Sequence, residues 1–249
     1  MYLLLSGEGK GDIGECSNTQ SECVRPEYQP GAMAYIVDKL VELFLGYEYS
    51  YLEYQGVTFV SEKYLVDNKL PARKKAMALP GKKKPAETQY YYQNARVLAN
   101  KAKLLAAEIN DKVVAVLFRD ADGTASAGRG HWQDKINSME KGFADEDYAE
   151  FGVPMMPMPK SEAWLLCAVK NNPYQNCGSL ENESGNDAAP NPLKSQLDKA
   201  LNGASSVQEQ INLVLDGTID VTQIDMPSFN YFKEKLQISV DIARRGANG

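Results

Sequence analysis

Unbroken runs of apolar residues predict the strands of this chain. The longest of these runs, residues 113–118, shows no alternation of polar and apolar positions. Such a run is typical of a strand that is covered on both faces in a parallel sheet. Similar runs predict strands at residues 2–5, 57–60 and 153–158. Prolines in the last run remove backbone donors, so we expect this strand to be short or to lie near an edge of the sheet.

Between these strands, apolar residues recur at helical spacing. They predict helices over residues 33–44, 88–110, 132–143 and 161–169, whereas residues 13–29 are polar and predict a loop. Strands that alternate with helices indicate an α/β fold with a mainly parallel sheet and helices on both faces. A polar stretch at 171–192 precedes three more helices, at 192–201, 206–215 and 228–243, which predict a helical C-terminal cap. We therefore expect a catalytic domain over residues 1–172, with a loop insertion and helical cap over 173–249 packed on the same domain.

Two aspartates follow the strand at 113–118. Asp120 and Asp122 would point the same way if the chain stays extended, and Gly123 would then let the backbone turn. Two neighbouring carboxylates repel each other strongly unless a cation lies between them. Oxygen ligands of this kind favour Mg²⁺ or Mn²⁺.

Two other predicted strands end near acids as well. Glu8 and Asp12 lie in a glycine-rich turn after the first strand, and Ser161 and Glu162 open a helix after the strand at 153–158. The glycine-rich turn lacks the pattern of a phosphate-binding loop. Acids from three strand ends at one edge of a sheet would form a metal-dependent phosphoryl-transfer site. The alternative is that Ser161 is only the N-cap of its helix, with Glu162 favourable in the first turn.

The order of these motifs resembles that of a Toprim domain, and more narrowly that of the Toprim nucleases of the OLD (overcoming lysogenization defect) class and their small stand-alone relatives. The resemblance covers the first two-thirds of the chain and includes an acid four positions after the first-strand acid, as in Glu8 and Asp12. It implies a metal-dependent nuclease acting on DNA or RNA, in phage defence or repair. The chain has no P-loop, so an ATPase would be a separate partner. The implied metal ligands are Glu8, Asp12, Asp120, Asp122 and Glu162, and the implied catalytic residues are Glu8, Asp120 and Asp122. Lys160, which lies beside Ser161 in the sequence, could contact a phosphate and is a further candidate catalytic residue.

Basic residues gather in one stretch of a chain whose net charge is −6. Between residues 69 and 84 there are seven lysines and arginines and no acid. A polyanionic substrate needs cations to hold its phosphates, so we predict nucleic-acid contacts there, although a solvated loop would look the same. The residues chosen for this role are Lys74, Lys75, Lys82, Lys83 and Lys84.

Two other functions remain open. A non-cleaving Toprim-like subunit that binds nucleic acid or a nucleotide would keep the fold and the metal, and a phosphatase acting on small esters would use the same acids. His131, the one histidine of the chain, is either a general acid or base or the first residue of a helix.

The remaining features concern the location of the protein. No apolar run approaches the ~20 residues that span a bilayer, so we expect no membrane partner and a cytoplasmic protein. The four cysteines fit this expectation, although Cys16 and Cys23 share a loop and could pair or bind a metal. One histidine and no CxxC spacing disfavour zinc. The oligomeric state stays open, a homo-oligomer included.

Overall fold

The protein has a central five-stranded sheet. The computed structural model describes residues 1–72, 86–121, 131–203 and 205–245. The strand order is β3-β5-β1-β6-β7, in which β5, β1, β6 and β7 are parallel and β3 pairs antiparallel with β5 at one edge. The strands are β1 (Tyr2–Gly7), β3 (Glu22–Val24), β5 (Val57–Ser61), β6 (Val113–Phe118) and β7 (Gly152–Met155). The predicted α/β fold with a mainly parallel sheet is thereby confirmed.

The burial of the strands follows the sequence pattern. All six residues of β6 are buried, as the unbroken apolar run predicts. In β1, Leu3 and Leu5 belong to the core on one face of the sheet, and Leu4 belongs to the core on the other. The proline-containing strand β7 lies at an edge of the sheet, as we expected.

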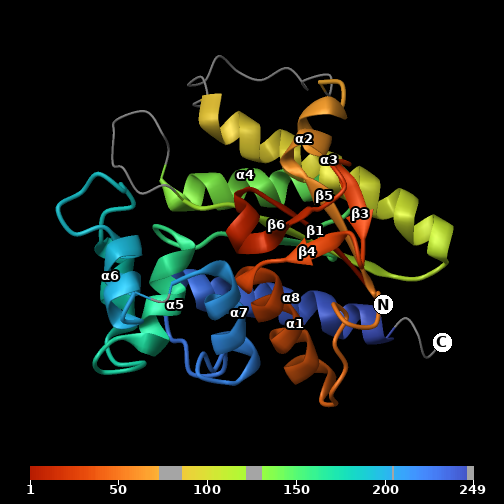
Figure 1. Cartoon of the computed structure of the whole chain (residues 1–249). Coiled ribbons are helices and arrows are strands. Elements are labelled where there is room, and N and C mark those ends of the chain that lie inside the picture. Colours follow the sequence, from red (N-terminus) through yellow and green to blue (C-terminus); the bar gives the residue numbers. More distant parts are fainter. Residues whose placement is uncertain (73–85, 122–130, 204, 246–249) are drawn as a thin grey trace.

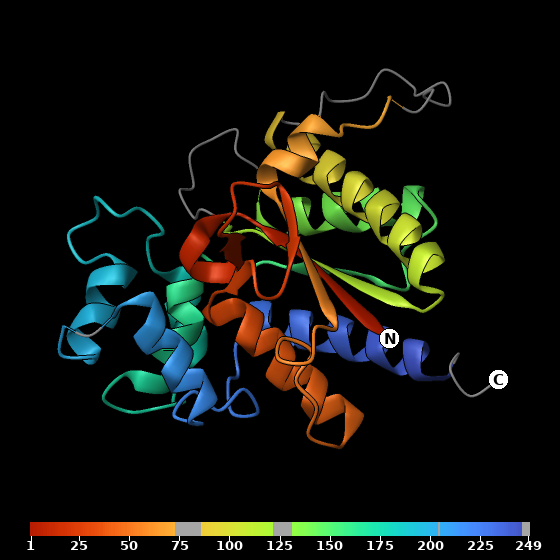
Figure 2. The same cartoon turned by 45° about the vertical axis from the view of Figure 1, so that its right-hand side comes forward.

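Helices cover both faces of the sheet (Figures 1 and 2). One face carries α2 (Glu62–Asp67), α3 (Ala86–Ile109) and α4 (Trp132–Asp145). The other face carries α1 (Ala32–Leu45), α5 (Ser161–Val169), α6 (Leu193–Ala200), α7 (Val207–Leu215) and α8 (Pro227–Arg245). The short helix α2 was not predicted, because its single buried residue, Leu65, gives no helical period.

The three helices predicted for the C-terminal part are present as α6, α7 and α8. Phe229 and Phe232 of α8 are fully buried and contact the ring of Trp164 in α5, with centroid distances of 4.9 and 5.8 Å. The indole N–H of Trp164 donates a hydrogen bond to Ser228 Oγ over 2.9 Å. The core on this face therefore combines residues from before and after the predicted boundary at residue 172, and that boundary stays a prediction.

The prediction of a loop over residues 13–29 is wrong in part. This segment contains β3 and a two-stranded antiparallel sheet of β2 (Gly14–Cys16) and β4 (Tyr28–Pro30). The buried ring of Tyr28 stacks on Phe59 with the centroids 4.9 Å apart, and a disulfide joins Cys16 to Cys23. These long-range contacts stabilise strands that are too short to be recognised from an alternating pattern.

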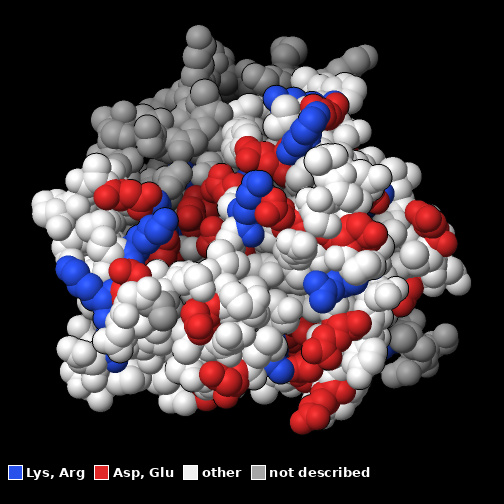
Figure 3. All heavy atoms as spheres, in the orientation of Figure 1, with Lys and Arg blue, Asp and Glu red and all other residues white. Residues whose placement is uncertain are grey.

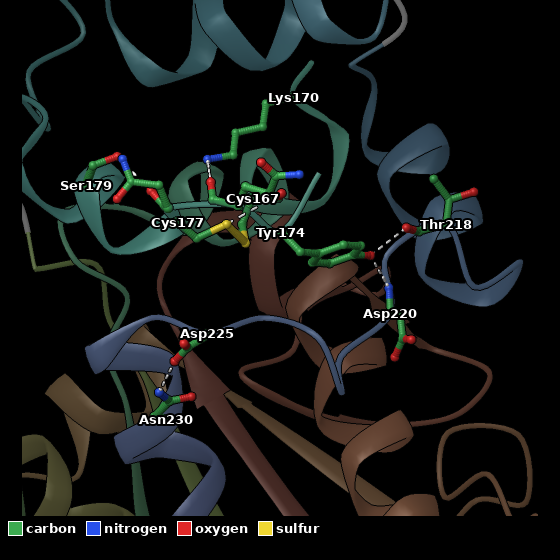
Figure 4. Close-up of a disulfide and its surroundings, with 11 residues drawn as sticks. Cys167, Lys170, Tyr174, Cys177, Ser179, Thr218, Asp220, Asp225 and Asn230 are labelled. Atoms are coloured by element: carbon green, nitrogen blue, oxygen red, sulfur yellow. Dashed lines mark hydrogen bonds between the residues drawn. A yellow bond between two sulfur atoms is a disulfide. The ribbon is translucent and has the colours of Figure 1, made fainter. Parts of the chain in front are cut away.

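A second disulfide, between Cys167 and Cys177, joins α5 to the 3₁₀-helix η2 (Cys177–Asn182) within the polar stretch (Figure 4). Nearby, the hydroxyl of Tyr174 donates to the carbonyl of Thr218 over 2.9 Å and accepts from the N–H of Asp220 over 2.8 Å. The stretch 171–192, which we predicted to be exposed, is thus fastened to the C-terminal helices.

All four cysteines are therefore paired. Cys16 and Cys23 were predicted either to pair or to bind a metal, and in the structure they pair. Disulfides are typical of oxidising compartments, so the cysteines do not support a cytoplasmic location, which stays a prediction. In the part of the chain that the structure describes, no helix is both long enough and apolar enough to cross a membrane.

Candidate functional site

The first acids of the candidate site follow β1. The chain leaves β1 through Glu8 and enters η1 (Gly9–Ile13), one turn of π-helix that carries Asp12. Gly9 has a φ of +82°, and a Cβ there would lie 2.3 Å from Asp12 Oδ2. Only glycine therefore allows the turn to bring the Asp12 carboxylate back toward the strand end.

Asp120 lies two residues beyond β6, next to the end of β1. Its backbone N–H donates a hydrogen bond to Glu8 Oε1 over 3.2 Å. Since β1 and β6 are neighbouring parallel strands, this bond joins their carboxyl ends. The predicted meeting of acids from two strand ends is thus present for Glu8 and Asp120.

Ser161 connects these acids to α5. Its backbone N–H donates to Asp120 Oδ1 over 3.0 Å, and its hydroxyl donates to Asp12. The predicted N-cap role of Ser161 is wrong, because Lys160 occupies that position and Ser161 is the first residue of α5. The side chain that accepts from the start of this helix is Asp120. Glu162, in the first turn, lies beside the group.

The electrostatics of the site reflect this crowding. Burial raises the pKa of Asp120 well above its ordinary value, and the carboxylates of Asp12 and Glu162 raise it further against the hydrogen bond from Ser161. Burial also raises the pKa of Asp12, while the Ser161 hydroxyl opposes this shift. Figure 3 shows acidic side chains gathered near the middle of the molecular face that it draws. The site accumulates negative charge that a cation would relieve.

The predicted catalytic residue Lys160 borders this group. Its ammonium nitrogen lies 3.0 Å from Oδ1 of Asp187, an exposed residue of the polar stretch. Burial raises the pKa of Asp12, and the positive charge of Lys160 partly opposes this rise. Lys160 is thus close enough to influence the acids while it is paired with another residue, and its catalytic role stays a prediction.

Carboxylate oxygens are suitable ligands for a hard divalent cation, but the described side chains of the site do not form a complete set of metal ligands. Among residues 1–72, 86–121, 131–203 and 205–245, no group of three or more His, Cys, Asp or Glu side chains could hold a metal ion. The predicted ligand Asp122 lies outside the described residues, and so do Lys74, Lys75, Lys82, Lys83 and Lys84. The metal-binding and nucleic-acid-binding roles therefore stay predictions.

His131 stands at the beginning of α4, in agreement with the interpretation of it as a helix-start residue. Its backbone N–H donates a hydrogen bond to Asp134 Oδ2 over 3.2 Å, and the residue is exposed. Its role as a general acid or base is not supported by any contact of its side chain with the acids in the described part of the chain.

Two residues near the site were not recognised from the sequence. Glu62 begins α2 directly after β5, and Arg119 follows β6 directly and is fully buried. Glu62 carries the same signal as Glu8, since both are acids that follow an apolar strand. Arg119 carries no such signal, because an arginine that follows an apolar run is usually exposed to solvent.

Comparison of the chain with protein-family models, with curated proteins and with solved structures found no match. The resemblance to Toprim domains therefore rests on the motif residues alone and stays a prediction.

Proposed function

We propose that the protein is a metal-dependent nuclease that hydrolyses phosphodiester bonds of DNA or RNA. The observation that carries this proposal is the meeting of Asp12 and Asp120 at Ser161, with Glu8 and Glu162 beside them. These acids come from separate strand ends. Burial raises the pKa of Asp120, and the charges of Asp12, Glu162 and Glu8 raise it further. Such a group is costly unless a cation offsets its charge.

In this proposal Glu8, Asp12 and Asp120 hold the cation, with Asp122 and Glu162 as further ligands. A bound Mg²⁺ or Mn²⁺ would lower the pKa of a coordinated water and offset charge on the scissile phosphate. Ser161 keeps the carboxylates of Asp12 and Asp120 in place through its hydroxyl and its N–H. Lys160 would contact a phosphate oxygen after leaving Asp187.

The proposed substrate is a polymer because of the seven basic residues between positions 69 and 84. A charged polymer needs several such contacts, and they would make its binding depend on salt. A role in phage defence or repair, with a separate ATPase as partner, is part of the same proposal and rests on the Toprim resemblance.

The decisive experiment is a cleavage assay on single- and double-stranded DNA and RNA with Mg²⁺ or Mn²⁺. It compares the wild type with Asp120→Asn and Asp12→Asn, and with Asp67→Asn as the matched control. Asp67 is an exposed acid on α2 that pairs with Lys63. We expect metal-dependent cutting that both site variants lose and the control keeps. Cutting that survives in both site variants would refute the proposal.

The alternative function is a non-cleaving subunit that binds nucleic acid or a nucleotide and keeps the fold and the metal. The seven basic residues between positions 69 and 84 favour a nucleic-acid ligand without requiring cleavage. The same oligonucleotide panel, followed by fluorescence anisotropy, separates the two functions. Tight binding without cutting in either metal would support the non-cleaving subunit.

A further inference from the structure

A cavity of about 630 Å³ lies next to the candidate site, and we call it the α1–α7 cavity. Residues of η1, β4, α1 and α7 line it, and β4, α1 and α7 come together in this region (Figure 1). The turn η1 packs closely on α7 there, since a Cβ on Gly11 would lie 3.0 Å from Cγ2 of Val207. The described acids of the candidate site do not line this cavity, although Asp12 directly follows Gly11 in the chain.

One wall of the α1–α7 cavity is apolar. Ile211 of α7 is buried, whereas Val207 and Leu215 on the same helix are 43% and 46% exposed. The three residues are spaced four apart, so they form one stripe along α7. Exposed apolar side chains inside a cavity with a few polar groups are typical of a ligand-binding site. A ligand with an apolar body would remove this stripe from water.

Arg25 brings a fixed positive charge to the cavity. Its Nη1 donates a hydrogen bond to the carbonyl oxygen of Tyr28 over 3.0 Å. In the part of the chain that the structure describes, its side chain has no other hydrogen bond and no ion pair. The disulfide between Cys16 and Cys23 fastens the strand that precedes it. Because a guanidinium carries five N–H donors, most of them remain for a ligand.

Tyr35 of α1 brings a hydroxyl group to the same cavity. Burial raises the pKa of this hydroxyl, and the positive charge of Arg25 partly opposes the rise, so the two groups lie close together. The phenol is therefore protonated at neutral pH and can donate a hydrogen bond. Among the described residues no hydrogen-bond partner accepts from it.

The lining of the cavity carries more positive than negative charge. It contains two cations, Lys10 and Arg25, and one acid, Glu15, in a chain whose net charge is −6. Lys10 pairs with Glu15 over 2.8 Å, but its side chain is 82% exposed. An exposed pair of this kind contributes little to stability, so Lys10 can turn toward an anionic ligand at small cost.

We propose that the α1–α7 cavity binds a small phosphate monoester with an apolar body, such as a nucleoside monophosphate. The phosphate oxygens accept hydrogen bonds from the guanidinium of Arg25 and the hydroxyl of Tyr35, and Lys10 offsets further negative charge. A phosphate monoester has three terminal oxygens and a charge of about −1.5 to −2 at pH 7, which matches two cations and a hydroxyl better than a carboxylate does.

The body of the ligand lies along Val207 and Leu215 of the apolar wall. This site goes beyond the proposed nuclease function, because it uses none of the acids of the candidate site.

The test is isothermal titration calorimetry of the full-length protein in a buffer that contains EDTA, so that no divalent cation takes part. The probes are AMP, with an aromatic body, n-hexyl phosphate, with an aliphatic body, and inorganic phosphate, which has the head group alone. We expect at least one ester to bind with a Kd below about 1 mM and about 10-fold or more tightly than inorganic phosphate. The ester that binds identifies the kind of body that the wall accepts.

Two variants test the residues that hold the phosphate. Arg25→Gln and Tyr35→Phe should each weaken ester binding by about 10- to 100-fold, because each removes a hydrogen bond to a charged group. The matched controls are Arg245→Gln and Tyr54→Phe, at exposed positions outside the cavity lining, and they should bind as the wild type does. Circular dichroism checks that each variant is folded. If Arg25→Gln fails to fold, Tyr35→Phe decides the outcome.

Each other result overturns the proposal. Neither ester binding below about 1 mM would show that the cavity is not a phosphate-ester site. Inorganic phosphate that binds as tightly as the esters would exclude a role for the apolar wall. Folded site variants that bind within about twofold of the wild type would place the bound ester somewhere else on the protein.

Discussion

The backbone N–H of Ser161 donates a hydrogen bond to Oδ1 of Asp120 across 3.0 Å. This bond fastens the beginning of α5 to the end of β6. The exposed N–H groups at a helix N-terminus carry partial positive charge, so they favour a carboxylate at this position. Because the same serine also donates its hydroxyl to Asp12, one residue determines how two acids of the site lie relative to each other.

Replacing Ser161 with alanine should separate these two contacts. Ser161→Ala keeps the N–H that donates to Asp120 but leaves Asp12 without its hydroxyl donor. A hydrogen bond to a charged group contributes about 1.5–3 kcal/mol, so we expect a loss of about 10- to 100-fold in cleavage rate. Ser179→Ala is the matched control, since that exposed hydroxyl donates only to the carbonyl of Asn176. Equal cleavage rates in the two variants would contradict the role given to Ser161.

Gly31 should tolerate no side chain. A Cβ at this position would lie 2.3 Å from the carbonyl oxygen of Asp12 and 2.4 Å from that of Gly11. Gly31→Ala must therefore push α1 away from η1, which we expect to lower the free energy of unfolding by about 1–3 kcal/mol and to weaken cleavage by displacing Asp12. Urea unfolding measures the first effect. At Gly178 a Cβ would have its nearest atom 3.8 Å away. The control Gly178→Ala should therefore have a free energy of unfolding within about 0.5 kcal/mol of that of the wild type.

Asp38 should make stability depend on pH. Burial raises its pKa to about 6, against hydrogen bonds from Ser50 and from the backbone of Tyr51 and Leu52. Because the pKa is higher in the folded state, the protonated form is favoured by folding. Its contribution is fully present below pH ~4 and is lost as the pH rises through about 6.

The variant Asp38→Asn keeps an acceptor and carries no charge at any pH. Its free energy of unfolding relative to the wild type should therefore increase between pH 4 and pH 7, by up to about 3 kcal/mol. Chemical unfolding at a series of pH values measures this difference. A difference that stays constant over the range would show that Asp38 does not titrate as described.

The two disulfides should differ in their accessibility to reductant. Cys167 and Cys177 are buried, whereas Cys16 is partly exposed. Dithiothreitol should reduce the Cys16–Cys23 bond in the native protein, and the Cys167–Cys177 bond only on unfolding.

The two disulfides close loops with sequence separations of 7 and 10 residues, which correspond to about 2–3 kcal/mol of stability each. Peptide mapping of alkylated, non-reduced protein checks the pairing, and free thiols in protein purified without reductant would contradict it.

The sheet was predictable where the hydrophobic pattern is strong. The run at residues 113–118 became β6 with the predicted bounds, because a strand buried on both faces leaves no polar position in the sequence. The helices α1 and α3 followed from their periodic apolar faces. By contrast, β2 and β4 have three residues each and depend on the stacking of Tyr28 on Phe59 and on a disulfide, which no local pattern reveals.

The site was predictable in part for a similar reason. Acids directly after apolar strands can be read from the sequence, and in a parallel sheet such positions meet at one edge, as Glu8 and Asp120 do. The interpretation of Ser161 as an N-cap was wrong by one residue, since a helix start in sequence does not show which neighbour accepts its N–H. The burial of Arg119 could not be foreseen, because it depends on Tyr90 and Glu62 from two other elements.

The central place of β1 in the sheet affects how the protein is made. Leu3 pairs with Val57 in β5 and with Val114 in β6, so the neighbours of the first strand are synthesised long after it. At ~5–20 residues per second, the nascent chain spends several seconds with both edges of β1 unpaired. An unpaired apolar strand is a hazard for aggregation, and the emerging chain carries this hazard until β5 and β6 have left the ribosome. Glu8 and Asp120 can meet only after that point, so the candidate site cannot form before then.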